Sequence, residues 1–233
     1  MKPQRPDSLI KSIQYVAGFL AFQTITWVVF TAISMSEVKQ NWSNNDFLSW
    51  AASPDFFFRG NYINATLLTL VAIVLFSLIF EFTRRSNPLL ALIGIVFVTI
   101  YGIINIVCYS MQIVIVPALA SDTLKAGSDV SYFVSQLIQA NRNSIVGYLN
   151  GLAYALLGIP SVLFGLELIK DNRRLSGVFL LLSGAASITG IIGYSIKSAP
   201  LSSLIVVGGV LFLFAVIFMI FEFRIHTGYS GRI

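Results

Sequence analysis

The sequence predicts an all-α membrane protein, a bundle of six transmembrane helices with cytoplasmic N- and C-termini and one short amphipathic outer helix. Apolar residues make up 56 % of the chain and charged residues only 11 %, against about 25 % charged in an ordinary soluble domain. No charged residue lies in the middle of a long apolar run. We expect one integral membrane domain over residues 1–233. The expected spans are 13–35, 63–82, 89–118, 145–169, 175–196 and 204–221.

Each run is long enough to cross about 30 Å of hydrocarbon at about 1.5 Å per helical residue. The first follows Lys2, Arg5 and Lys11, a pattern that also occurs in signal peptides, and Ala32-Ile33-Ser34 has small residues at a cleavage-like spacing. Its apolar stretch exceeds the roughly 7–15 residues of a signal peptide. We therefore favour an uncleaved first span.

The segment 36–62 separates the first two spans and is rich in aromatic residues. Such rings favour the headgroup region, where an apolar face and a polar edge are both satisfied. The segment is either a loop on the outer membrane surface or a lid over an outward-facing cavity. Its aromatic residues are Trp42, Phe47, Trp50, Phe56, Phe57 and Phe58.

The third span carries a polar face, and Pro117 is expected to end it. Tyr101, Asn105, Cys108 and Gln112 recur at helical spacing. A second outer segment follows at 121–144, where Ser128 is a plausible N-cap. The short amphipathic helix expected there is either interfacial, packed on the bundle, or a gate. Its apolar residues are Val130, Phe133, Val134, Leu137 and Ile138.

Two other spans add neutral polar groups. The first has Thr24, Trp27, Thr31 and Ser34 in a stripe with Gln23 beside it, and the fourth has Tyr148, Asn150 and Tyr154. Unpaired amides are costly in lipid, so these faces should point inward. They either hold helices together at about 0.6 kcal/mol per hydrogen bond or line a cavity for a small molecule. The cavity interpretation also predicts that a small polar thiol reagent labels Cys108.

Small residues mark the fourth and fifth spans. Gly151, Gly158 and Gly165 are seven residues apart, and Ser183, Ser187 and Gly190 follow on the fifth span, a composition that permits close helix approach. Pro160 removes a backbone donor and is expected to kink the fourth span. The kink is either a packing feature or a hinge.

Charge gathers at the ends of the spans. The second, fourth and sixth end alike, in Phe80-Glu81-Phe82, Leu166-Glu167-Leu168 and Phe221-Glu222-Phe223 followed by a base. This is either a weak threefold repeat or the usual charge at a membrane boundary. Orientation follows from the bases, because cytoplasmic segments are richer in Lys and Arg. Ten of the fifteen would be inside: Lys2, Arg5, Lys11, Arg84, Arg85, Lys170, Arg173, Arg174, Arg224 and Arg232.

The residue inventory argues against several functions. One Cys and one His, His226, cannot make a zinc site of three or four such ligands. No acid lies mid-span as a proton relay, and no glycine pattern resembles a phosphate-binding loop. No basic stripe indicates a nucleic-acid partner. We expect no metal and no cofactor.

The C-terminal half resembles a group of uncharacterised prokaryotic six-span membrane proteins classed as a domain of unknown function. The resemblance rests on Gly158-Ile159-Pro160 with Gly147 and Gly165, on the run 173–179, and on Ser183-Gly184 with Gly190. It covers about a third of the chain. It implies six helices and a cell-membrane location, and it carries over no catalytic or binding residue.

Three functional hypotheses remain. The first is a non-enzymatic protein that binds a neutral or amphipathic small molecule or lipid in an outward-opening polar cavity. The second is a structural or accessory subunit that binds partner helices through its small-residue faces. The third is a membrane-embedded enzyme acting on lipid headgroups from its loops. The cavity hypothesis assigns the lining to Gln23, Thr24, Trp27, Tyr101, Asn105, Gln112 and Asn150.

Overall fold

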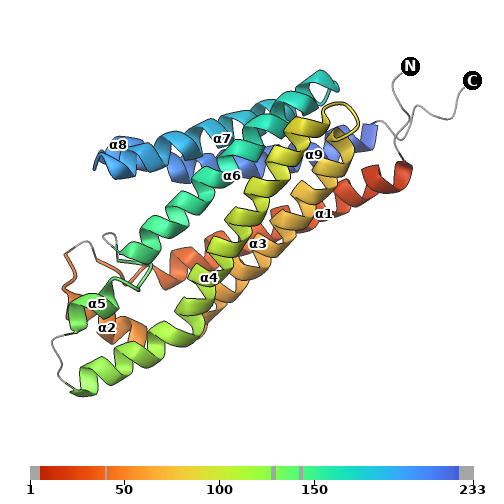
Figure 1. Cartoon of the computed structure of the whole chain (residues 1–233). Helices are drawn as coiled ribbons and strands as arrows, with labels where there is room; N and C mark the ends of the chain where they lie inside the picture. Colours follow the sequence, from red (N-terminus) through yellow and green to blue (C-terminus); the bar gives the residue numbers. More distant parts are fainter. Residues whose placement is uncertain (1–5, 40, 127–129, 142–143, 226–233) are drawn as a thin grey trace, which may run out of the picture. The chain divides into compact units, whose positions relative to one another are not determined.

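The computed structural model describes residues 6–39, 41–126, 130–141 and 144–225, and within them every regular element is a helix. Six helices are long and apolar enough to cross a membrane, which confirms the all-α class and makes this a multi-pass membrane protein. They are α1 (Asp7–Ser34), α3 (Phe56–Thr83), α4 (Pro88–Ala126), α6 (Ile145–Lys170), α7 (Arg174–Ser195) and α9 (Leu204–Ile225). The short helices are α2 (Asn44–Ala52), α5 (Ser131–Ser135) and α8 (Ala199–Ser202) (Figure 1).

Two helix boundaries differ from the prediction. Helix α3 begins at Phe56 instead of residue 63, because the Asp55 side chain accepts the Phe58 backbone N–H at 2.6 Å and caps its first turn. Helix α4 runs through Pro117 to Ala126, so the prediction that Pro117 ends it is wrong. Val116 and Ala120 beside the proline are fully buried in an apolar cluster, and this packing stabilises the helix beyond the proline.

Some predictions concern residues outside the described ranges. These are the bases Lys2, Arg5 and Arg232, the N-cap Ser128 and the position of His226; the side chain of Arg224 is likewise not described. The chain also divides by its contacts into two compact units. The first holds the described residues of Met1–Phe22, Leu70–Gly102 and Leu152–Ile233, and the second holds those of Gln23–Thr69 and Ile103–Gly151.

Glycines in the first unit bring α6 and α7 into backbone contact. A Cβ added at Gly158 would meet the carbonyl oxygen of Gly184 at 2.7 Å, and one added at Gly165 would meet that of Gly177 at 2.7 Å. Both distances are too short for a side chain. The regularly spaced glycines of the fourth span therefore pack against another helix of the same chain. Helix α6 continues through the buried Pro160.

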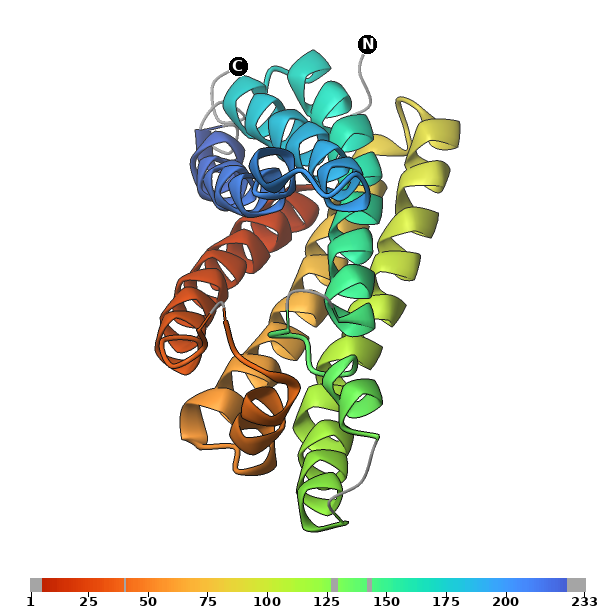
Figure 2. The same cartoon turned by 90° about the vertical axis from the view of Figure 1, so that its left-hand side faces the viewer.

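A second face of α7 packs along α9, as Figures 1 and 2 show. Here the Ser183 hydroxyl donates to the carbonyl oxygen of Gly208 at 2.8 Å, and a Cβ at Gly190 would meet the backbone nitrogen of Ile205 at 2.6 Å. Small residues thus line both faces of α7. Close backbone approach is the way helices gain van der Waals contact in lipid, where the hydrophobic effect does not drive their association.

The three similar span ends behave in two ways. Glu81 pairs with Arg84 at 2.7 Å and Glu167 with Lys170 at 2.8 Å. Glu222 instead caps helix α7: its carboxylate accepts the backbone N–H groups of Leu175 at 2.9 Å and Ser176 at 3.0 Å. A carboxylate at a helix N-terminus satisfies otherwise unpaired N–H groups and complements the helix dipole.

Arg173, in the turn before α7, is the largest fully buried side chain in the described residues, at 1 % exposed. Its guanidinium lies 3.7 Å from the ring centroid of Phe223 and 4.8 Å from that of Phe82. It also donates to the carbonyl oxygen of Glu222 at 3.1 Å and lies 3.5 Å from the carboxylate of Asp171. A buried charge is tolerated when aromatic faces, carbonyls and a counter-ion replace water.

In the second unit, the aromatic segment 36–62 is not a simple loop. It contains α2, and its last residues form the first turns of α3. Ser43 and Asp46 make a reciprocal capping box at the start of α2. The backbone N–H and the hydroxyl of Ser43 donate to the Asp46 carboxylate and hold the pKa of that exposed group below its usual range.

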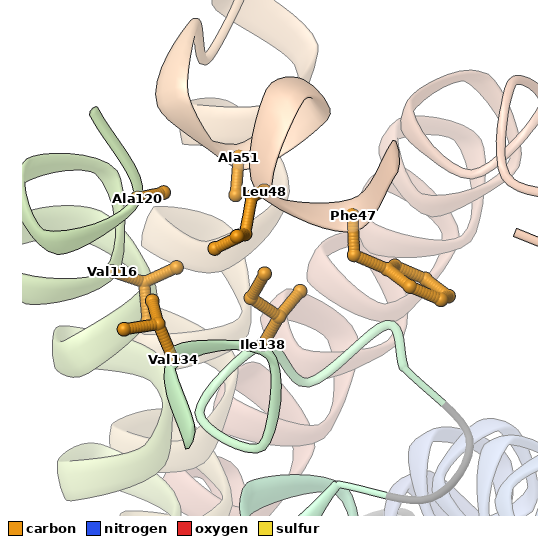
Figure 3. Close-up of a cluster of buried hydrophobic side chains, with 7 residues drawn as sticks. All are labelled: Phe47, Leu48, Ala51, Val116, Ala120, Val134 and Ile138. Carbon is orange, nitrogen blue, oxygen red and sulfur yellow. The ribbon is translucent and has the colours of Figure 1, made fainter. Parts of the chain in front are cut away.

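Helices α2 and α5 lie side by side and bury a common apolar cluster against α4 (Figure 3). The Ser135 hydroxyl also bonds the side-chain oxygen of Asn44 at 3.0 Å. The amphipathic helix expected in 121–144 is only the five residues of α5, with Val134 buried and Phe133 exposed. The cluster comprises Phe47, Leu48, Ala51, Val116, Ala120, Val134 and Ile138.

Candidate functional site

A partly enclosed pocket of about 200 Å³ lies within the second unit. Helix α1 contributes two residues to it and the position directly after α1 one, α3 contributes three and α4 one, and the segment after α5 adds two more. None of these nine described residues is charged. The lining consists of Trp27, Thr31, Met35, Asn61, Tyr62, Ala65, Tyr109, Gln139 and Ala140.

Two lining residues carry a buried polar atom that has no partner in the described part of the chain, the hydroxyl of Tyr62 and the side-chain oxygen of Gln139. Tyr62 is 1 % exposed. The other polar pair of the lining is satisfied, because the Thr31 hydroxyl donates to the Asn61 side-chain oxygen at 2.7 Å. A buried polar group without a partner costs roughly 1–3 kcal/mol, so these two atoms need a further partner.

An amide network lies next to the pocket and is joined to it through Gln139. Asn150 is the centre of this network. Its Nδ2 donates to Asn105 Oδ1 at 3.0 Å and to the Tyr109 hydroxyl at 2.9 Å, and its Oδ1 accepts from Gln139 Nε2 at 3.2 Å. Helices α4 and α6 and the segment after α5 therefore meet at the Asn150 side chain.

Gln112 holds the chain after α5 in place. Its Nε2 donates to the carbonyl oxygen of Leu137 at 2.8 Å, and its Oε1 accepts the backbone N–H of Gln139 at 3.0 Å. Both polar ends of a fully buried glutamine are therefore bound to backbone. This clamp fixes the position from which Gln139 reaches the pocket.

The predicted lining residues do not all line the pocket. Trp27 lines the pocket. Asn105, Gln112 and Asn150 form the adjoining network instead. Gln23 contributes only its backbone carbonyl oxygen, which accepts from Asn64 Nδ2 at 3.3 Å.

Three further residues of the polar faces lie outside the lining. Thr24 belongs to the second unit but is not among the residues that line the pocket. Tyr101 belongs to the first, where its ring centroid lies 5.9 Å from that of Tyr154. Cys108 is 2 % exposed, and its sulfur lies 4.0 Å from the carbonyl oxygen of Val146. The structure therefore predicts slow labelling of Cys108, the opposite of the sequence-based expectation.

The sequence reasoning missed the apolar lining residues Met35, Ala65 and Ala140 and the polar lining residues Asn61, Tyr62, Tyr109 and Gln139. Asn61 and Tyr62 belonged to a segment read as loop, and their spacing of three to four residues from Ala65 was the available signal for a helical face. Tyr109 is four residues after Asn105 and three before Gln112, and this helical spacing was the available signal for it. Gln139 is placed by the clamp of Gln112, for which helical periodicity gives no signal.

Among the described residues, no three His, Cys, Asp or Glu side chains come together as metal ligands. Comparison with known proteins adds no relative: no family model, curated protein or solved structure matches this chain. The functional argument therefore rests on the pocket and the network.

Proposed function

We propose that this multi-pass membrane protein binds a small uncharged or amphipathic molecule in the pocket of its second unit and carries out no chemistry on it. The supporting observation is that two buried polar atoms, the Tyr62 hydroxyl and Gln139 Oε1, lack partners beside an uncharged pocket. A ligand that bonds both atoms would offset a cost of roughly 1–3 kcal/mol for each. The protein binds this molecule in the cell membrane, with both termini in the cytoplasm.

The size of the pocket limits the ligand. At about 200 Å³ it is smaller than the roughly 300–1,000 Å³ of pockets for drug-sized molecules. A water molecule occupies about 30 Å³ of liquid, so the pocket holds about six groups of that size. The ligand is a small molecule, or the head of a longer one whose tail leaves through the opening.

The accessory-subunit alternative loses its main support. Gly158 and Gly165, which it assigned to a partner helix, are buried against Gly184 and Gly177 of α7. No specific surface among the described residues favours the lipid-modifying enzyme, and the pocket lining contains no acid or base that titrates near neutral pH.

A pocket-filling variant tests the proposal. Ala65 is 3 % exposed and lines the pocket, so Ala65→Leu places additional carbon atoms there. Ala118→Leu is the matched control, on an exposed position of α4 in the same unit. Native mass spectrometry of protein released gently from membrane should show a bound small molecule on the wild type and on Ala118→Leu, and none on Ala65→Leu. A wild-type chain without any added mass, or equal occupancy in all three, would refute the proposal.

The orientation has its own test, because the single Cys108 is buried. A cysteine introduced at the exposed Lys125 should react with a membrane-impermeant maleimide on intact cells. One introduced at the exposed Arg174 should react only after the cells are opened. The reverse pattern would place the termini outside.

A further inference from the structure

We infer that the pocket recognises a hydroxyl group, so that its ligand is an aliphatic alcohol, either a small free alcohol or the hydroxyl-bearing head of a neutral lipid. This inference rests on the proposed function and specifies its ligand. In it, the alcohol O–H donates to Gln139 Oε1, and the alcohol oxygen accepts from the Tyr62 hydroxyl. Both protein atoms are buried and without partners in the described chain.

The amide network determines which end of Gln139 is offered to the ligand. Gln139 Nε2 already donates to Asn150 Oδ1 at 3.2 Å. Asn150 Nδ2 donates to the side-chain oxygen of Asn105 at 3.0 Å and to the Tyr109 hydroxyl at 2.9 Å, so in this structure Asn150 presents its oxygen to Gln139, while Asn105 Nδ2 has no partner in the described chain. The oxygen of Gln139 is thus left as an acceptor, and it requires a donor from the ligand.

The Tyr62 hydroxyl can complete the arrangement by donating to the ligand. A hydroxyl both donates and accepts, so an alcohol offers the donor that Gln139 Oε1 requires and the acceptor that the Tyr62 hydroxyl requires. An ether or ketone only accepts and would leave Gln139 Oε1 buried and unpaired. For this reason the pocket should strongly reject analogues that lack the hydroxyl.

Charged ligands are disfavoured by the same lining. An ammonium group would find no carboxylate among the nine lining residues, and a phosphate or carboxylate would find no Lys or Arg. Burying either charge without a counter-ion costs several kcal/mol. The carbon part of an alcohol would instead contact Trp27, Met35 and Ala65, where burial of apolar surface is favourable at about 25 cal/mol per Å².

Photolabelling of the full-length protein in lipid nanodiscs tests the inference. The probes are azioctanol, an eight-carbon alcohol that carries an aliphatic diazirine, and its methyl ether, with labelled residues mapped by mass spectrometry. The alcohol should label pocket residues at least tenfold more than the ether. Tyr62→Phe should reduce labelling by the alcohol several-fold and leave the ether unchanged. Tyr15→Phe, at a 77 % exposed tyrosine of the first unit, should change neither.

Tyr62→Phe removes a hydroxyl that bonds nothing in the described chain, so the variant should fold with an unchanged or higher apparent Tm. Competition then identifies the source of the alcohol: 1,2-dioleoylglycerol should displace the probe if the ligand is a lipid head, and 1-hexanol alone if it is a free alcohol. Equal labelling by alcohol and ether, insensitive to Tyr62→Phe, would overturn hydroxyl recognition while leaving the proposed function intact. Absence of pocket labelling by either probe would overturn both.

Discussion

Replacing Asn150 with leucine should cost about 2 kcal/mol of unfolding free energy. The Asn150 side chain makes three hydrogen bonds, to Asn105, Tyr109 and Gln139. Interhelical hydrogen bonds in membrane proteins contribute about 0.6 kcal/mol each on average, and leucine keeps the same branched heavy-atom skeleton. The three partners find no replacement in an apolar side chain, so the sum of the three bonds is the expected loss.

Tryptophan fluorescence is a suitable assay for this loss. The three tryptophans of the chain, Trp27, Trp42 and Trp50, all lie in the second unit with the network. Equilibrium unfolding by SDS in mixed micelles therefore reports on the unit that the substitution perturbs. The control is Ser110→Ala, because the exposed Ser110 bonds only the carbonyl oxygen of Val107 on its own helix. We expect less than about 0.5 kcal/mol for the control.

A double substitution of Asn150 and Asn105 to leucine should cost less than the sum of the single substitutions, since the two side chains share a bond. If Asn150→Leu costs no more than Ser110→Ala, the network does not stabilise the unit. The argument that it orients Gln139 would then fail as well.

Three further predictions concern other parts of the fold. Glu222→Gln should speed amide hydrogen exchange in the first turn of α7 about fivefold, as expected for loss of a cap worth about 1 kcal/mol, whereas Glu81→Gln in the same Phe-Glu-Phe context should not. Gly184→Ala should lower stability by about 1–3 kcal/mol, because its Cβ would meet the backbone of α6. Thermal unfolding followed by circular dichroism measures this, and the control Gly209→Ala, with nothing within 4 Å of its Cβ, should be neutral or stabilising. Asp46 has a lowered pKa, so its carboxylate cap fully stabilises α2 above the unfolded pKa of about 3.9 and is lost as pH falls through the lower folded value. In the same fluorescence assay, the wild type should therefore lose more stability between about pH 5 and pH 2 than Asp46→Asn does.

The sequence was sufficient to predict six membrane-spanning helices, because length and apolar composition are read directly from the chain. It was insufficient where packing overrides a local signal. Pro117 normally stops a helix, yet α4 continues to Ala126 under the packing of α2 and α5. Conversely, the start of α3 could have been predicted, since Asp55 three residues before Phe58 is a recognisable N-cap signal.

The candidate site was predicted in part for similar reasons. The stripe on the first span contained Trp27 and Thr31, which line the pocket. The amides at Asn105 and Gln112 were expected to point inward, and they are buried, but they bond to protein instead of lining space. Periodicity shows which face of a helix is polar and not what that face meets. Gln139 depends on a contact between distant segments, which one sequence does not reveal.

The distribution of charge explains why a neutral pocket would need a hydrogen-bond pattern to be selective. The buried Arg173 and the capping Glu222 lie at helix ends, where backbone and aromatic partners are available. Between these ends the described spans offer a ligand only hydroxyls, amides and apolar surface. An amide rotated by 180° exchanges a donor for an acceptor, so selectivity from neutral groups requires that the amides be held. Asn150 bonds the side-chain amide of Gln139 and Gln112 holds its backbone, and these roles account for buried amides beside the pocket.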